Sequence, residues 1–260
     1  MLDPLRIRLA HGTRTARFPE PGDVLPERYR GRPVLNAGSC PGDCLATAGA
    51  PIRRDAEGRA ALDLGASVFA PEEAARCPHG AVTFSNDYRL TATERTGLCA
   101  TGDAPLPLQP LSAAMQRLFG RSLRLRSVVA GSCGGCEAEL IALGNVVYDM
   151  ARFGVEFVAS PRHADGLVIT GVVNTNMRDA LLKTWEATPA PRIVIAVGAC
   201  ALGGGPFAGS REVLGIPESI PVDLWIAGCP PHPLSLLDGL LRLLGRLPAE
   251  RLGRQGNALD

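Results

Sequence analysis

The sequence predicts an α/β protein with a doubly wound parallel sheet in its second half, preceded by a smaller region of less defined class. Three observations predict it. Five short apolar runs follow residue 111, segments with helical spacing of apolar residues separate them, and the last three runs are nearly continuous in Val, Ile and Leu. Continuous apolar runs of this length are typical of parallel strands buried on both faces by helices.

The expected strands span residues 123–129, 155–159, 167–170, 193–197 and 222–227. Helices are expected at 137–152, 176–188 and 233–246. The last helix has Pro233 in its first turn, where the missing N–H costs no hydrogen bond. Strands that alternate with helices in this way form a sheet with helices on both faces.

A linker divides the chain near residue 110. The segment ATGDAPLPLQP at 100–110 carries three prolines in eleven residues. Before it, apolar stretches such as 60–64 and 67–70 are short. We therefore expect a small domain with its linker at 1–110 and a larger domain at 111–260.

Composition and charge exclude several classes of protein. The 260 residues include 27 Lys+Arg and 26 Asp+Glu, which gives a net charge of +1 and argues against nucleic-acid binding. No run approaches the ~18 apolar residues of a membrane span. We expect a cytoplasmic protein, in which the eight cysteines are metal ligands or free thiols rather than disulfides.

Four cysteines follow the ends of expected strands. Cys133 and Cys136 stand in GSCGGCE after the first strand, Cys200 in VGACALGGG after the fourth and Cys229 in AGCPPHP after the fifth. The carboxyl ends of parallel strands share one edge of the sheet, which is the usual ligand site. The surrounding glycines permit the close backbone approach that a cysteine-ligated centre needs.

Four interpretations of these cysteines differ in chemistry. They could be buried inert thiols, ligands of a tetrahedral zinc ion, or a thioredoxin-like CGGC redox pair with two unrelated cysteines. The pattern of one C-x-x-C pair and two distant single cysteines favours the fourth, a single [4Fe–4S] cluster.

The same segments resemble a known family. The runs RSLRLRSVVAGSCGGCEAEL, RFGVEFVASPRHADGLVITG, PAPRIVIAVGACALGGGPF and VDLWIAGCPPHPLSLLDGLLRLLGR look like the small subunit of group 4, membrane-bound NiFe hydrogenases and its homologue in complex I, the NADH-quinone oxidoreductase. The resemblance covers residues 120–247. It implies that Cys133, Cys136, Cys200 and Cys229 ligate one [4Fe–4S] cluster, and the CGGC spacing resembles the hydrogenase side.

Glu139 lies one helical turn past Cys136, where the family has an acidic residue. The resemblance implies proton handling beside the cluster. An acid in the first turn of a helix is also favoured by the helix dipole alone, a role that Glu137 could fill as well.

A weaker resemblance covers residues 30–98. The segment LDLGASVFAPEEAARCPHGAVTF resembles half of a two-cluster ferredoxin that has lost most of its ligands. The ligand positions hold Ser67, Ala70, Glu73 and Cys77, and the preceding half keeps only Cys44 in register. This region is interpreted as a degenerate ferredoxin-like domain retained for docking. The alternative is a second, rearranged site made of Cys40, Cys44, Cys77 and Cys99.

Together with the expected sheet, the resemblance implies an electron-transfer subunit of a multisubunit, membrane-associated oxidoreductase, with a flavodoxin-like main domain. The expected partners are a large catalytic subunit, of NiFe-hydrogenase type or of the complex I D-subunit type, and other iron–sulfur and membrane subunits. The chain itself would lie peripherally on the inner face of the membrane. A complex I-like subunit serving quinone reduction and a non-enzymatic zinc or assembly protein are the alternatives.

Overall fold

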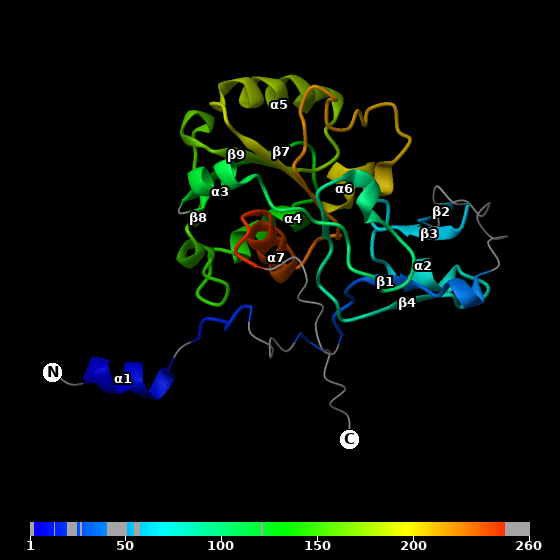
Figure 1. Cartoon of the computed structure of the whole chain (residues 1–260), viewed down its shortest axis with the longest axis horizontal. Coiled ribbons are helices and arrows are strands. Elements are labelled where there is room, and N and C mark those ends of the chain that lie inside the picture. The colour runs from blue at the N-terminus through cyan, green and yellow to red at the C-terminus, as the bar shows by residue number, and fades with distance from the viewer. Residues whose placement is uncertain are drawn as a thin grey trace.

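A six-stranded sheet forms the centre of the computed structural model, which describes residues 3–12, 14–19, 25–26, 28–40, 51–54, 58–120 and 122–247. The strand order is β5–β11–β10–β9–β7–β8 (Figure 1). The strands are β5 (Thr91–Ala92), β7 (Leu123–Val129), β8 (Val155–Phe157), β9 (Gly166–Thr170), β10 (Ile193–Val197) and β11 (Leu224–Ile226). All neighbours are parallel except β5 and β11. The parallel part has the order of flavodoxin-like folds, and the largely parallel sheet is confirmed.

Helices cover both faces of this sheet. Figure 1 shows α5 (Thr175–Ala187) on one side and α4 (Gly135–Ala142) and α7 (Pro233–Leu243) on the other. Ile195 of β10 belongs to the core that includes the α4 and α7 leucines, whereas its neighbour Val194 packs in the α5 core. Both faces are therefore buried, which explains the continuous apolar sequence of β10.

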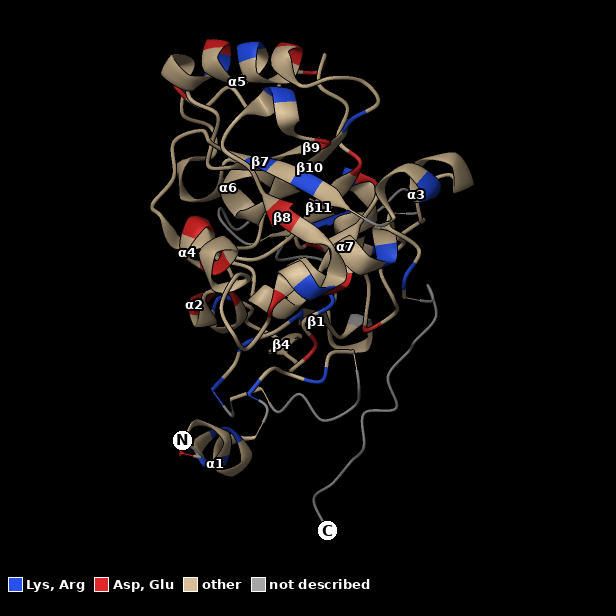
Figure 2. Ribbon diagram, turned by 90° about the vertical axis from the view of Figure 1, so that its left-hand side faces the viewer, with Lys and Arg blue, Asp and Glu red and all other residues tan. Residues whose placement is uncertain are grey.

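Two further helices flank the sheet, α3 (Ala113–Phe119) and α6 (Gly198–Gly203). Helix α5 carries both acidic and basic residues, coloured red and blue in Figure 2, and these residues are exposed. Short 3₁₀ turns are η1 (Ala37–Ser39), η3 (Arg95–Leu98), η4 (Met150–Phe153), η5 (Pro161–His163) and η6 (Gly205–Phe207). Within the described ranges, no helix is long and apolar enough to cross a bilayer.

Truncating a core side chain of β10 should destabilise the protein strongly. Ile195 is 1% exposed, and Ile195→Ala is expected to lower the free energy of unfolding by about 2–5 kcal/mol, because a cavity remains between helix and sheet. Ile141→Ala, at a position 78% exposed on α4, is the matched control and should change it by less than about 1 kcal/mol. Urea unfolding followed by circular dichroism measures both, and equal losses would contradict this core.

The helix expected at 137–152 is much shorter in the structure. It ends at Ala142, and the chain then turns instead of continuing. Asn145 causes this, since its Oδ1 accepts hydrogen bonds from the backbone N–H groups of Val147 (2.8 Å) and Tyr148 (3.1 Å). An asparagine side chain that bonds the following backbone competes with the helix, and Gly144 weakens the helix further.

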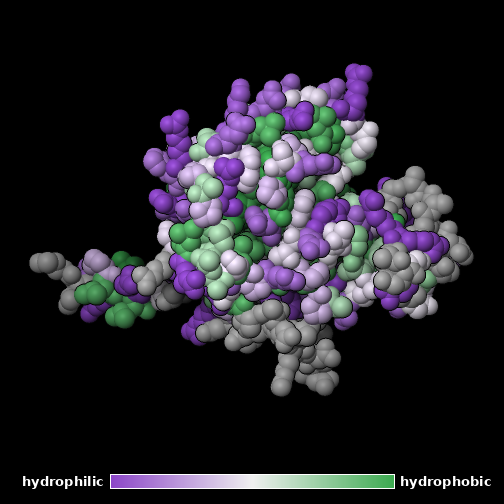
Figure 3. All heavy atoms as spheres, turned by 45° about the horizontal axis from the view of Figure 1, so that its top comes forward, coloured by the Kyte–Doolittle hydropathy of each residue, from purple (hydrophilic) through white to green (hydrophobic). Residues whose placement is uncertain are grey.

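The part of the chain before residue 111, called the front part below, forms two small antiparallel sheets. One pairs β1 (Pro33–Leu35) with β4 (Val82–Phe84), and the other has the order β2–β3–β6, with β2 at Ile52–Arg54, β3 at Ala60–Asp63 and β6 at Cys99–Ala100. The short helix α2 (Pro71–Ala75) lies before β4. Helix α1 (Asp3–His11) extends away from the body and has no buried residue (Figures 1 and 3).

The front part also joins the main sheet. Strand β5 pairs with β11, with Ala92 opposite Trp225 and Thr91 opposite Ile226. One apolar cluster contains Leu64 and Leu98 from the front part together with Leu202 of α6. Residues 60–100 consequently pack directly against the segment that follows β10.

Candidate functional site

The structure brings the four candidate cysteines to the carboxyl edge of the parallel strands. Cys133 lies in the turn after β7, and Cys136 is the second residue of α4. Cys200 is the third residue of α6, directly after β10, and Cys229 follows β11 by three residues. Cys136 and Cys200 are half-buried, whereas Cys133 and Cys229 are exposed.

The loops that carry these cysteines lie against one another. A Cβ atom built at Gly198, at the start of α6, would lie 2.5 Å from the Cys136 Sγ atom. One built at Gly135 would lie 3.6 Å from the Cys133 Sγ atom and 3.7 Å from Pro230, the residue after Cys229. Segments after β7, β10 and β11 thus meet beside the sulfur atoms of Cys133 and Cys136.

The electrostatics of the thiols reflect this convergence. The pKa of Cys136 is raised to about 12, first by burial and then by nearby charges that include the other three thiols. Burial, followed by Cys229 and Cys133, raises the pKa of Cys200. Burial and Cys133 likewise raise the pKa of Cys229. The pKa of each of these three thiols is therefore raised in part by thiols that follow other strands.

The chemistry of this donor set, four thiols, suits a cationic, cysteine-ligated group. Thiols with raised pKa values are protonated at neutral pH, and a bound cation would compensate the charge of four thiolates, with protons released on binding. Gly198 has no side chain, and this leaves space for the Cys136 sulfur atom. A side chain at position 198 would fill that space. Among the described residues, no group of three or more Cys, His, Asp or Glu side chains has the arrangement that holds a metal ion.

Comparisons with known proteins place the chain in a family. Residues 133–243, which include all four cysteines, match the family described as NADH ubiquinone oxidoreductase, 20 Kd subunit. A probable membrane-bound hydrogenase subunit mbhJ of Pyrococcus furiosus is 42% identical over 141 residues, 54% of this chain and 84% of its own. The chain belongs to this family. Its relatives are oxidoreductase subunits.

Relatives of both enzyme types align with the chain. Formate hydrogenlyase subunit 7 of Escherichia coli is 40% identical over 151 residues, which are 58% of this chain and 59% of its own. The B-type NADH-quinone oxidoreductase subunit of Citrifermentans bemidjiense is 45% identical over 116 residues, 45% of this chain and 68% of its own. The resemblance to hydrogenase and complex I subunits is therefore confirmed. The match to the 20 Kd subunit family begins at Cys133, and the ferredoxin-like resemblance of residues 30–98 stays a prediction.

Glu137 connects two of the strand ends beside the candidate cysteines. Its carboxylate accepts a hydrogen bond from the Ser132 hydroxyl at 2.8 Å and another from the hydroxyl of Thr170, the last residue of β9. Sequence reasoning gave Glu137 only a first-turn role. The hydroxyl residues that follow β7 and end β9 are the signal that could have indicated this bridge.

Glu139 lies three residues after Cys136 on α4, about one helical turn, and is half-buried. Burial raises the pKa of its carboxyl group. The charge of Glu139 also contributes to the raised pKa of Tyr29, which places the two groups near each other. Its expected part in proton handling stays a prediction.

His232, the residue before α7, acts as a helix cap. Its Nδ1 atom accepts a hydrogen bond from the backbone N–H of Leu234 at 3.2 Å, and its ring lies edge-on to Tyr29 and Tyr148. Burial lowers the pKa of His232. These contacts describe a packed, capping histidine.

The cysteines of the front part are placed differently. Cys77 is buried and its Sγ atom accepts a hydrogen bond from the backbone N–H of Ala81, Cys40 borders the same apolar cluster, and Cys99 is exposed on β6. Cys44 lies outside the described residues, so the second-site alternative stays a prediction.

Ser67 and Glu73, two positions that the sequence analysis aligned with ferredoxin ligands, are hydrogen-bonded to each other. The Ser67 hydroxyl donates to Glu73 Oε2 at 2.5 Å, and the backbone N–H of Val68 donates to Glu73 Oε1 at 2.6 Å. Glu73 also contributes to the raised pKa of Cys229. The front part thereby places a buried carboxylate near the candidate site.

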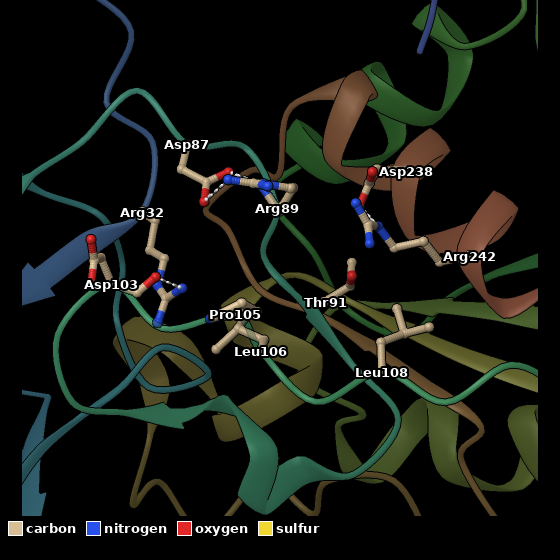
Figure 4. Close-up of a pocket in the computed structure, with 10 residues that line it drawn as sticks. All are labelled: Arg32, Asp87, Arg89, Thr91, Asp103, Pro105, Leu106, Leu108, Asp238 and Arg242. Atoms are coloured by element: carbon tan, nitrogen blue, oxygen red, sulfur yellow. Dashed lines mark hydrogen bonds and ion pairs between the residues drawn. The ribbon is translucent and has the colours of Figure 1, made fainter. Parts of the chain in front are cut away.

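A separate pocket between the front part and α7 is charge-balanced (Figure 4). Asp87 receives two hydrogen bonds from Arg89, at 2.7 and 2.9 Å, and Asp238 receives one from Arg242 at 2.7 Å. The lining residues are Arg32, Asp87, Arg89, Thr91, Asp103, Pro105, Leu106, Leu108, Asp238 and Arg242. Since Arg89 and Arg242 are paired with carboxylates of the lining and Arg32 donates to backbone carbonyl groups, we interpret the pocket as part of the packing between the two regions.

Proposed function

We propose that the chain is an iron–sulfur electron-transfer subunit of a membrane-associated oxidoreductase, and that Cys133, Cys136, Cys200 and Cys229 hold one [4Fe–4S] cluster. The observation that carries this proposal is the contact between the loops after three strands: a Cβ atom at Gly198 would lie 2.5 Å from the Cys136 Sγ atom, and one at Gly135 would lie 3.6 Å from the Cys133 Sγ atom and 3.7 Å from Pro230. A ligand set requires cysteines from different loops to lie close together, whereas separate core cysteines need no such proximity.

Such a cluster, when bound, would take up and release one electron at a time. The chain's own residues would set its surroundings. Glu137, fixed by Ser132 and Thr170, would hold the start of α4 in place behind Cys136. The exposure of Cys133 and Cys229 would leave one side of the centre open to a partner, as electron transfer between subunits requires.

The partner would be a large catalytic subunit of NiFe-hydrogenase type, with further iron–sulfur and membrane subunits. We place the complex on the inner face of the membrane, with this chain attached peripherally through its partners. The hydrogenase-type relatives and the CGGC spacing support this assignment. A complex I-like role in quinone reduction is the second candidate, supported by the 45% identity to a NADH-quinone oxidoreductase component. Residues 1–110 would be the degenerate ferredoxin-like domain and residues 111–260 the cluster domain.

Anaerobic purification of the chain with its co-purifying subunits tests the proposal. We expect about four iron atoms per chain and a broad absorption near ~400 nm that bleaches on reduction. Zinc in place of iron, or neither metal, would contradict it. About eight iron atoms per chain would instead indicate a second site in the front part.

The same preparation separates the two enzyme types. Nickel in the complex, with reduction of the cluster by H₂, is the expected result for the hydrogenase assignment. Quinone-dependent turnover without nickel would overturn that assignment in favour of the complex I-like role.

A further inference from the structure

Helix α6, which carries Cys200, is held at its C-terminal end by the front part of the chain. The last carbonyl groups of a helix have no partner within it. Here the carbonyl of Leu202 accepts a hydrogen bond from Arg95 Nε at 2.9 Å. Arg95 is the first residue of η3, 107 positions earlier in the sequence, and a cation at this end of a helix is favoured.

Asp63 fixes the arginine. The Nη atoms of Arg95 donate to its two carboxylate oxygens at 2.7 and 3.0 Å, a bidentate pair. Asp63 is 3% exposed, ends β3, and also accepts a hydrogen bond from the backbone N–H of Gly65 at 3.0 Å. The guanidinium group therefore has a single orientation, with Nε aimed at α6.

The contact between Arg95 and α6 leaves no space for side chains at Gly65 and Gly203. A Cβ atom at Gly65 would lie 2.5 Å from the Arg95 Cζ atom, and one at Gly203, the last residue of α6, would lie 3.0 Å from the Gly65 carbonyl oxygen. Beside this contact, Leu202 packs into an apolar cluster with Leu64 and Leu98. A shift of Arg95 would therefore be transmitted to α6.

We propose that Arg95, oriented by Asp63, is a positioning residue that fixes helix α6 and thereby the Cys200 sulfur at the cluster site. Both residues lie outside the segment that matches the family, 133–243. The front part would then act on the redox centre directly, because it would hold the helix that carries Cys200 in place. This inference rests on the proposed function, since it takes Cys200 as a ligand.

Hydrogen exchange of the full chain tests the bracing in the absence of iron. In Arg95→Ala, amides of residues 198–204 should exchange about tenfold faster, the change expected from losing a charge-assisted hydrogen bond. Arg53→Ala is the matched control. Arg53 pairs with the same carboxylate at 3.0 Å but its side chain is 64% exposed, and its removal should leave exchange of α6 unchanged. Equal exchange in both variants would overturn the inference.

A second measurement uses the iron-loaded chain. Arg95→Ala should lose iron to a chelator about tenfold faster and shift the cluster's reduction potential, as loss of an orienting contact behind a ligand does. Arg95→Lys keeps the charge but cannot donate to Asp63 and Leu202 in the same forked geometry, so it should behave like Arg95→Ala. Full recovery by Arg95→Lys would contradict positioning and indicate an effect of charge alone.

Different results would refute the proposed function and the positioning role of Arg95. A wild-type chain without iron would refute the proposed function, while the exchange experiment would still report on the brace. Iron-loaded wild type with an unaffected Arg95→Ala variant would refute the brace alone. If Arg95→Ala does not fold, as judged by circular dichroism, Arg95→Lys provides both readouts.

Discussion

Replacing Cys200 by alanine is expected to abolish the EPR signal of the reduced cluster and to lower the bound iron from about four atoms per chain to less than one. The thiolate of a cysteine is the ligand for iron, and a methyl side chain offers no donor atom. No other cysteine stands between residues 137 and 228 of the sequence, so none near Cys200 in the chain can replace it. EPR spectroscopy of the dithionite-reduced protein and iron analysis measure the effect.

Cys77→Ala is the control for this variant. Cys77 is buried in the front part, where its sulfur accepts a backbone hydrogen bond, and its loss should leave both spectrum and iron content intact. An unchanged spectrum in Cys200→Ala would count directly against our ligand set. A loss of half the iron in Cys77→Ala would favour a second site in the front part.

Gly198→Ala is expected to prevent cluster binding although no ligand is removed. The added methyl group would lie 2.5 Å from the Cys136 Sγ atom, a distance that requires the sulfur or the backbone to move. The backbone at Gly198 has φ +87°, a conformation that alanine adopts only with strain. We expect the bound iron to fall below about one atom per chain and the thermal stability of the iron-loaded protein to fall with it.

Gly209→Ala separates the strain from the steric contact. Gly209 has a similar φ of +83°, yet apart from its two chain neighbours no atom of the residues that the structure describes lies within 4 Å of its added Cβ atom. This variant should lose only a small amount of stability and keep its full iron content. Retention of iron in Gly198→Ala, or equal loss of iron in both glycine variants, would contradict this prediction. Either result would show that cluster binding does not depend on the close contact between Gly198 and the Cys136 sulfur atom.

The pattern of apolar residues predicted the strands of the sheet well where both faces of a strand are buried. The bounds expected for the strands at 123–129 and 193–197 are those of β7 and β10. The same reasoning overextended the helix after Cys136, because the turn around Asn145 depends on a side-chain hydrogen bond rather than on apolar spacing. Helix α6 was missed since its sequence, GACALG, contains glycines that weaken helical propensity.

Contacts between distant segments could not be predicted from the sequence. The pairing of Thr91–Ala92 with β11 involves a strand of two residues, too short to produce a pattern. The Asp63–Arg95 pair joins residues 32 positions apart and then reaches α6, which only the folded chain reveals. The positions of the four cysteines were predictable, by contrast, because each follows closely on a strand whose end the apolar pattern defines.

The most direct test of the cluster proposal is an anaerobically determined structure of the iron-loaded chain. We predict one cubane bonded to the Sγ atoms of Cys133, Cys136, Cys200 and Cys229, with a different iron atom bound to each. A cluster held by any other set of residues, or a single zinc ion among these thiols, would contradict the proposal.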